Sequence, residues 1–170
     1  MIFFKRQEGY SIEHVIDTLV SLGKHKERVA NLVDNPEDRE KMILNLINKE
    51  LDLVGINYKL KGRKYCEEAI TCMMDENNRS NPNFYVFQHI GKKYKVEPNS
   101  INKAIQTAIN EAWRTTATED LKEHYTAKIN INTGVPTPTE FICYYSEKIN
   151  SSVRKSRKRS VFISSLASIF

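Results

Sequence analysis

The sequence predicts an all-α fold that contains a helix-turn-helix unit and carries an N-terminal helical extension. Apolar residues recur at helical spacing in every periodic stretch between residues 39 and 150. The 170 residues include only six glycines and five prolines, too few for a turn-rich β-sandwich. Two of the predicted helices are separated only by residues 96–99, the short connection that a helix-turn-helix requires.

The predicted elements divide the chain into three parts. Residues 1–35 form the N-terminal extension, with helices expected over 11–22 and 26–33. Pro36 suits the first turn of the next helix, and Gly55 ends it. Within the domain of residues 36–150, helices are expected over 36–54, 63–75, 84–95, 100–114, 118–125 and 139–149. The tail of residues 151–170 differs in composition and is treated as a separate segment.

Charge alone does not indicate a nucleic-acid partner. The formal net charge is +5, but five cations lie in one short run, so the rest of the chain sums to zero. These cations are Arg154, Lys155, Arg157, Lys158 and Arg159. They precede the apolar VFISSLASIF end, and such a tail binds phosphates of DNA or of anionic lipid. We favour an auxiliary DNA arm over a disordered solvated arm or a membrane-surface anchor.

The sequence contains no recognisable catalytic or metal site. Cys66, Cys72 and Cys143 form no CxxC pair and do not lie at metal-ligand spacing from the four histidines, so buried, reduced thiols are expected. There is no glycine-rich phosphate loop. We therefore expect neither an enzyme nor a cofactor. No secretory signal or membrane span is visible, which predicts a cytoplasmic location.

The helix predicted over residues 100–114 has two chemically different faces. Its apolar face carries Ile101, Ile105, Ala108, Ile109, Ala112 and Trp113. Its polar face carries Asn99, Asn102, Lys103, Gln106, Thr107 and Asn110, none of them acidic. Such side chains bind base edges and phosphates in a major groove, although an ordinary solvated face remains the alternative. Gly91 is expected where the preceding helix crosses this one.

Several separated segments resemble one known family. LKGRKYCEEAI, IGKKY with SINKAIQTAINEAW, and PTPTEFI are similar to the C-terminal effector domain of the stage-zero sporulation response regulator. The resemblance covers residues 39–150 in order. It implies a six-helix domain of the winged-helix-like class of response-regulator effector domains, with the third and fourth helices as the helix-turn-helix. It also implies a sequence-specific transcription regulator that contacts its neighbours on double-stranded DNA partly through its last helix.

The resemblance also implies roles for individual residues. Asn102, Lys103 and Gln106 match base-reading positions, and Ser100 and Thr107 lie near phosphate-contacting positions. We add Asn99, Lys92 and Lys93 as further phosphate contacts. The family tends to carry Glu and two Arg where this chain has Asn, Lys and Gln, so the resemblance does not predict the sequence of the DNA box.

Control and partners follow from the same comparison. The family's regulator has a phosphate-accepting receiver domain, which residues 1–35 are too few to form, so phosphorylation-independent binding is expected. The opening IFFKRQEGYSIEHVIDTLV faintly resembles the end of a receiver, and a simple packing or dimerising extension is the alternative. Expected partners are a second copy, as a homodimer or tandem dimer, and RNA polymerase or a full-length sporulation regulator. An interaction module that antagonises such a regulator is the alternative function, and a peripheral membrane protein is a third.

Overall fold

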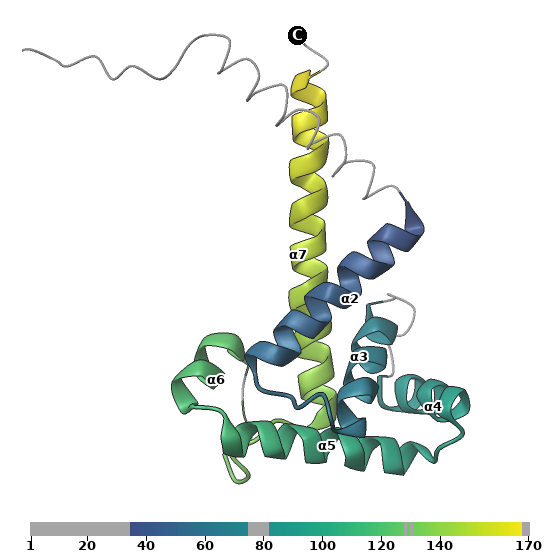
Figure 1. Cartoon of the computed structure of the whole chain (residues 1–170), viewed down its shortest axis with the longest axis vertical. Helices are drawn as coiled ribbons and strands as arrows, with labels where there is room; N and C mark the ends of the chain where they lie inside the picture. Colours follow the sequence, from purple (N-terminus) through teal and green to yellow (C-terminus); the bar gives the residue numbers. More distant parts are fainter. Residues whose placement is uncertain (1–34, 75–81, 128, 130, 168–170) are drawn as a thin grey trace, which may run out of the picture. The chain divides into compact units, whose positions relative to one another are not determined.

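The computed structural model describes residues 35–74, 82–127, 129 and 131–167 (Figure 1). The chain divides into two units after Arg39, and nearly all described residues belong to the second. The helices predicted over 11–22 and 26–33, and the suggested receiver remnant, lie outside the described residues. Every regular element in the described ranges is a helix.

The described residues form six helices, which confirms the all-α prediction. They are α2 (Pro36–Leu53), α3 (Lys61–Met73), α4 (Pro82–Tyr94), α5 (Pro98–Thr115), α6 (Thr118–His124) and α7 (Pro138–Ala167). Gly55 follows α2 with φ of 75°, in the left-handed conformation typical of a helix end. The start of α5 differs from the prediction: Pro98 lies in its first turn and not in the connection, because proline fits that position.

The predicted end of the last helix at Ile149 was wrong, because α7 continues to Ala167. No glycine or proline interrupts residues 139–167. The hydroxyl of Ser152 donates to the carbonyl of Lys148 at 3.0 Å, and that of Ser156 donates to the carbonyl of Ser152 at 3.1 Å. Serine hydroxyls bonded one turn back are compatible with a continuing helix. The change in composition after Asn150 therefore does not end the helix.

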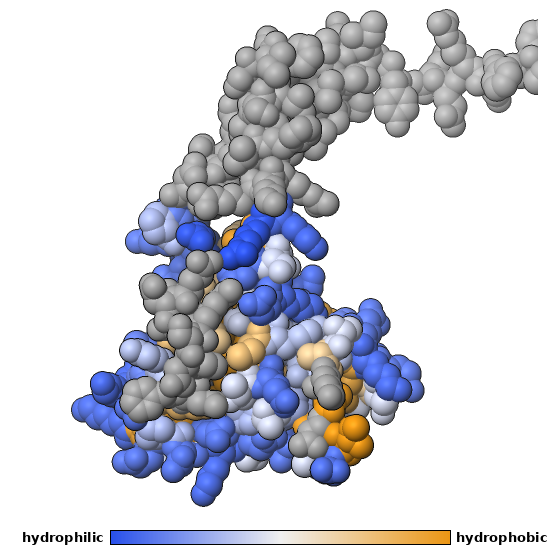
Figure 2. Space-filling view, turned by 180° about the vertical axis from the view of Figure 1, so that it is seen from behind, coloured by the Kyte–Doolittle hydropathy of each residue, from blue (hydrophilic) through white to orange (hydrophobic). Residues whose placement is uncertain are grey.

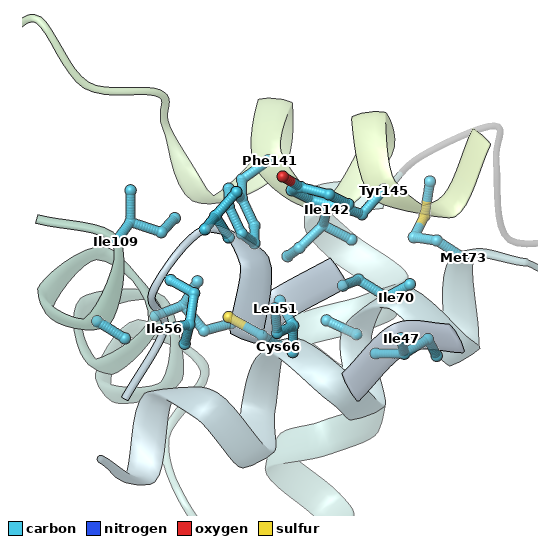
Figure 3. Packing of buried hydrophobic residues seen from close by; sticks show 14 of the residues in the cluster. Ile47, Leu51, Ile56, Cys66, Ile70, Met73, Ile109, Phe141, Ile142 and Tyr145 are labelled. Carbon is cyan, nitrogen blue, oxygen red and sulfur yellow. The ribbon is translucent and has the colours of Figure 1, made fainter. Parts of the chain in front are cut away.

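The core lies around α3, which packs against α4, α5 and α7. Figure 3 shows side chains from α2, α3, α5 and α7 meeting there. Fully buried members include Ile47, Leu51, Cys66, Ile70, Ile105, Ile109, Phe141 and Tyr145. Burial raises the pKa of the Cys66 thiol to about 12, so this thiol is uncharged and unreactive at neutral pH.

Helices α3 and α5 approach each other closely at Gly62, where the two helices cross. A Cβ atom at Gly62 would lie 2.1 Å from the carbonyl oxygen of Ala104 and 2.8 Å from the Cβ of Ala108. The sequence predicts Gly91 at a different crossing, that of α4 with α5. A Cβ at Gly91 would meet the carbonyl oxygen of Val96 at 2.7 Å and the ring of Pro98, the first residue of α5, at 3.6 Å. Gly91 therefore makes room for the turn and for the start of α5.

Arg63 joins α2 and the loop after it to α3. It is only 6% exposed, and its guanidinium contacts Asp52 at 2.7 Å and Glu67 at 3.0 Å. It also donates to the carbonyl of Ile56 at 2.8 Å and to the side-chain oxygen of Asn48 at 2.9 Å. A buried charge requires such partners, and here they hold together segments separated by up to 15 residues in the sequence.

A capping box begins α7. The backbone N–H and the hydroxyl of Thr137 donate to Glu140 Oε2 at 2.9 and 2.8 Å, and the Glu140 N–H donates to Thr137 Oγ1 at 3.3 Å. This reciprocal pair satisfies backbone donors that the first turn of a helix leaves free. The hydrogen bonds from the Thr137 backbone and side chain hold the pKa of the Glu140 carboxyl below its usual value.

We expect Thr137→Ala to lower the free energy of unfolding by about 1 kcal/mol at pH 7, the usual cost of losing such a cap.

The contribution of the Glu140 charge to the free energy of unfolding depends on pH. Because the folded-state pKa lies below the unfolded value, this contribution is complete above the unfolded pKa and is lost as pH falls through the folded one. Urea unfolding should therefore show Glu140→Gln differing from the unaltered chain at pH 7 and converging with it under acid conditions. An equal difference at both pH values would contradict this assignment.

Candidate nucleic-acid interface

Helices α4 and α5 are joined by residues 95–97 in a backbone-fixed turn. Lys95 adopts the left-handed conformation with φ of 54°, and the Val96 N–H donates to the Gly91 carbonyl at 3.0 Å. This bond closes the end of α4 in the manner of a Schellman motif. Pro98 then starts α5. The two helices and their short connection form the predicted helix-turn-helix.

Helix α5 has a buried face and an exposed polar face. Its buried residues are Ile101, Ile105, Ala108, Ile109 and Ala112. The opposite face carries exposed side chains at successive spacings of three and four residues. We call this set the polar stripe: Ser100, Lys103, Thr107, Asn110 and Arg114. The stripe contains no carboxylate, and the exposed Asn99 and Asn102 lie at its edge.

Arg114 was missed by the sequence analysis, which treated it only as the last residue of the helix. The signal was present, because Arg114 lies 11 residues after Lys103, three helical turns along the same face. The structure continues α5 to Thr115, so the Arg114 side chain projects from a complete turn. Its charge extends the cationic character of the stripe to the far end of the helix.

Gln106 lies at the border between the polar stripe and the loop before α7. It is half-buried, and its Nε2 donates to Asn110 Oδ1 at 2.9 Å and to the Pro136 carbonyl at 3.2 Å. The amide is therefore engaged inside the protein, unlike the exposed side chain of Lys103. The sequence could not indicate this, because Pro136 is 30 residues away.

The two lysines proposed as phosphate contacts differ in their surroundings. Lys92 is exposed. Lys93 Nζ lies 2.6 Å from Glu68 Oε1, and the Tyr94 hydroxyl donates to the same carboxylate at 2.8 Å. These contacts join α4 to α3, although half of the Lys93 side chain remains exposed, at 50%.

Opposing effects act on the carboxyl of Glu68. Burial raises its pKa, but the hydrogen bonds from Lys93 and Tyr94, with the charges of Lys93 and Lys64, outweigh burial and leave the pKa below its usual value. Burial and the bond to Glu68 raise the pKa of Tyr94 to about 12. The carboxylate is therefore ionised at neutral pH and supports the Lys93 pair that holds the helix-turn-helix against α3.

The basic run lies along α7, away from the polar stripe. Arg154 and Lys155 are exposed, and residues 157–159 continue the helix. Figure 1 shows α7 leading away from α5 past α2 and α3. At 1.5 Å per residue, Arg154 lies about 24 Å along the helix from Pro138. The structure thus does not bring the run and the stripe onto one surface, and contact of the run with DNA stays a prediction.

Comparison with known proteins identifies the family. Residues 47–149, more than half of the chain, match the family model described as sporulation initiation factor Spo0A C terminal. The chain belongs to this family. The matched range includes the helix-turn-helix, the polar stripe and the first part of α7. Members of the Spo0A C-terminal family are helical DNA-binding domains of sporulation regulators and not enzymes. The matched domain of this chain is therefore assigned to DNA binding and transcription regulation.

Among the residues that the structure describes, no helix is both long and apolar enough to cross a membrane. Within the same ranges, no group of three or more His, Cys, Asp or Glu side chains is placed to hold a metal ion.

Proposed function

We propose that this chain is a sequence-specific transcription regulator that recognises short boxes in double-stranded DNA by placing α5 in the major groove. The observation that carries the proposal is the polar stripe. It is exposed, lacks carboxylates, and lies on a helix whose other face is fixed in the core. A recognition helix in a helix-turn-helix needs both properties, because side chains must reach base edges from a rigid support.

Base recognition is assigned to Asn102, Lys103 and Gln106. Lysine donates to the guanine acceptors O6 and N7, and asparagine or glutamine can form a bidentate pair with adenine. Lys103 and Asn102 are already exposed for these contacts. Gln106 joins them by exchanging its bond to Asn110 for one to a base, while its bond to Pro136 remains.

Phosphate contacts are assigned to residues along α5 and in the last turn of α4. Asn99 and Ser100 lie in its first turn, where backbone N–H groups and the helix dipole favour an anion. Thr107 and Lys92 are exposed on the helix-turn-helix. Lys93 is paired with Glu68, but half of its side chain is exposed, so its ammonium group can also contact a phosphate. We add Arg114 at the C-terminal end of the helix.

We further propose that binding does not require phosphorylation, since the polar stripe is exposed without rearrangement of the described residues. We also propose that the chain binds DNA as a homodimer or tandem dimer, with contacts through α7, and that it contacts RNA polymerase.

One observation favours the antagonist function as a second candidate. Helix α7 extends to Ala167, past residue 149 where the family match ends, and this extension offers a surface for pairing with a full-length regulator.

Selection from a pool of random DNA duplexes tests the proposal. The 170-residue chain is expected to enrich one short motif, and acetyl phosphate in the binding buffer is expected to change neither the motif nor the affinity. A bound pool without an enriched motif would contradict the proposed function as a sequence-specific regulator. The antagonist would be supported if, in addition, the chain removed a full-length family regulator from its DNA.

A further inference from the structure

The loop between α6 and α7 projects beside the proposed recognition helix. Residues 131–135 form a turn in which the Thr133 hydroxyl donates to the Val135 carbonyl at 3.1 Å. Gly134 has φ of 68°, and a Cβ built there meets no atom within 4 Å. The tip of this loop is therefore surrounded by open space, and Figure 1 shows the loop hanging below α5, on the side away from α3.

The tip carries an apolar side chain that the protein does not bury. Ile131 is 91% exposed, more than the other exposed large hydrophobic residues described, Tyr58, Tyr85 and Leu53. Its neighbours Asn132, Thr133 and Gly134 are exposed as well. Figure 2 shows a hydrophobic patch at the lower edge of a largely hydrophilic surface, where Figure 1 places this loop.

The base of the loop is held firmly, in contrast to its exposed tip. Pro136 and Pro138 are buried, and the capping box fixes Thr137 at the start of α7. The Gln106 amide donates to the Pro136 carbonyl at 3.2 Å, so the loop is attached directly to α5 next to the polar stripe. The position of Ile131 is thus coupled to that of the recognition helix.

We propose that Ile131 contacts the minor groove of the DNA segment that flanks the box read by α5. The inference rests on the proposed function, because it requires α5 in the major groove. A loop that is fixed at its base beside a helix in that groove can reach across the adjacent backbone toward the minor groove. Apolar side chains contact base steps there, and the pattern read there distinguishes A·T from G·C pairs. The loop thereby adds a preference for A·T pairs outside the box.

The test compares three duplexes that carry the selected box and differ only in the flank, which contains A·T, inosine·C or G·C pairs. An inosine·C pair resembles A·T in the minor groove, because inosine lacks the guanine 2-amino group, but resembles G·C in the major groove. The unaltered chain is expected to bind the A·T and inosine·C duplexes equally and the G·C duplex roughly tenfold more weakly. Ile131→Ser should bind all three like the G·C duplex, and Ile131→Leu should retain the difference.

Several outcomes would overturn the proposal. If Ile131→Ser bound each of the three duplexes with the same affinity as the unaltered chain has for that duplex, the loop would not contact DNA. If it bound single boxes normally and lost only cooperativity on two boxes, Ile131 would contact a second copy of the chain. Lys103→Ala is measured alongside. A changed base preference in Lys103→Ala with an unaffected Ile131→Ser would refute the loop contact alone, whereas no effect in either variant would refute the proposed function.

Discussion

Gly62→Ala should lower the free energy of unfolding by about 3 kcal/mol and weaken DNA binding at the same time. The added Cβ would lie 2.1 Å from the carbonyl oxygen of Ala104, a backbone atom that cannot rotate away, so α3 and α5 must separate. Overpacking of a core commonly costs about 1–3 kcal/mol, and this approach is a severe case. The higher helix propensity of alanine, worth at most about 1 kcal/mol, is too small to offset it.

Gly134→Ala is the matched control for this prediction. Unlike Gly62, Gly134 has a positive φ, and a Cβ there meets nothing within 4 Å, so the substitution costs only the left-handed conformation, about 1 kcal/mol. Urea unfolding measures the stability of both variants, and fluorescence anisotropy with the selected duplex measures the affinity of Gly62→Ala. If Gly62→Ala were no less stable than Gly134→Ala, the close crossing of α3 and α5 would be refuted.

Arg63→Met should also cost about 3 kcal/mol, without changing which DNA is bound. The substitution leaves the half-buried carboxylate of Glu67 and the buried carbonyl of Ile56 without their donor, and breaking a buried charge network is strongly destabilising. The pair with Asp52 contributes little to this estimate, because the Asp52 side chain is 69% exposed. Arg63→Lys keeps the charge but loses the planar guanidinium, so it should recover only part of the stability.

The exposed Lys61 provides the control for Arg63, since it lies in the same first turn of α3 and carries the same charge. Lys61→Met is expected to change stability by less than about 0.5 kcal/mol. Both variants are compared by urea unfolding, and their base preference is measured at low temperature, where each remains folded. Equal stability of Arg63→Met and Lys61→Met would show that the buried network is not a major source of stability. An altered base preference in Arg63→Met would place Arg63 closer to the DNA surface than the structure does.

The secondary structure and one face of the site could be predicted from sequence because both depend on local periodicity. The stripe of Ile101, Ile105 and Ile109 identifies the buried side of α5, and the polar side follows directly. The same reasoning failed for α7, where a change in composition near Asn150 was taken for the end of a helix. A helix ends where a backbone bond is lost, and serines with charged neighbours do not cause that loss.

Contacts between distant segments explain what the sequence could not indicate. The bond from Gln106 to Pro136 spans 30 residues and the Lys93 pair with Glu68 spans 25, so neither has a spacing signature. Each of these two contacts engages a side chain that the sequence predicts to contact DNA, Gln106 in the first case and Lys93 in the second. Gly62 and Arg63 were visible as residue types, but their importance depends on which helices meet at them.

The role of α5 as the recognition helix is tested by the base preference of Lys103→Ala, compared with Lys122→Ala as a control on the exposed face of α6. Each variant selects from the same random duplex pool, and circular dichroism checks that both remain folded. We expect Lys103→Ala to lose preference at one or two base positions, equivalent to about 1–3 kcal/mol each, and Lys122→Ala to select the original motif. If Lys103→Ala weakened binding equally for every sequence, or left the motif unchanged, α5 would not be the helix that reads the DNA.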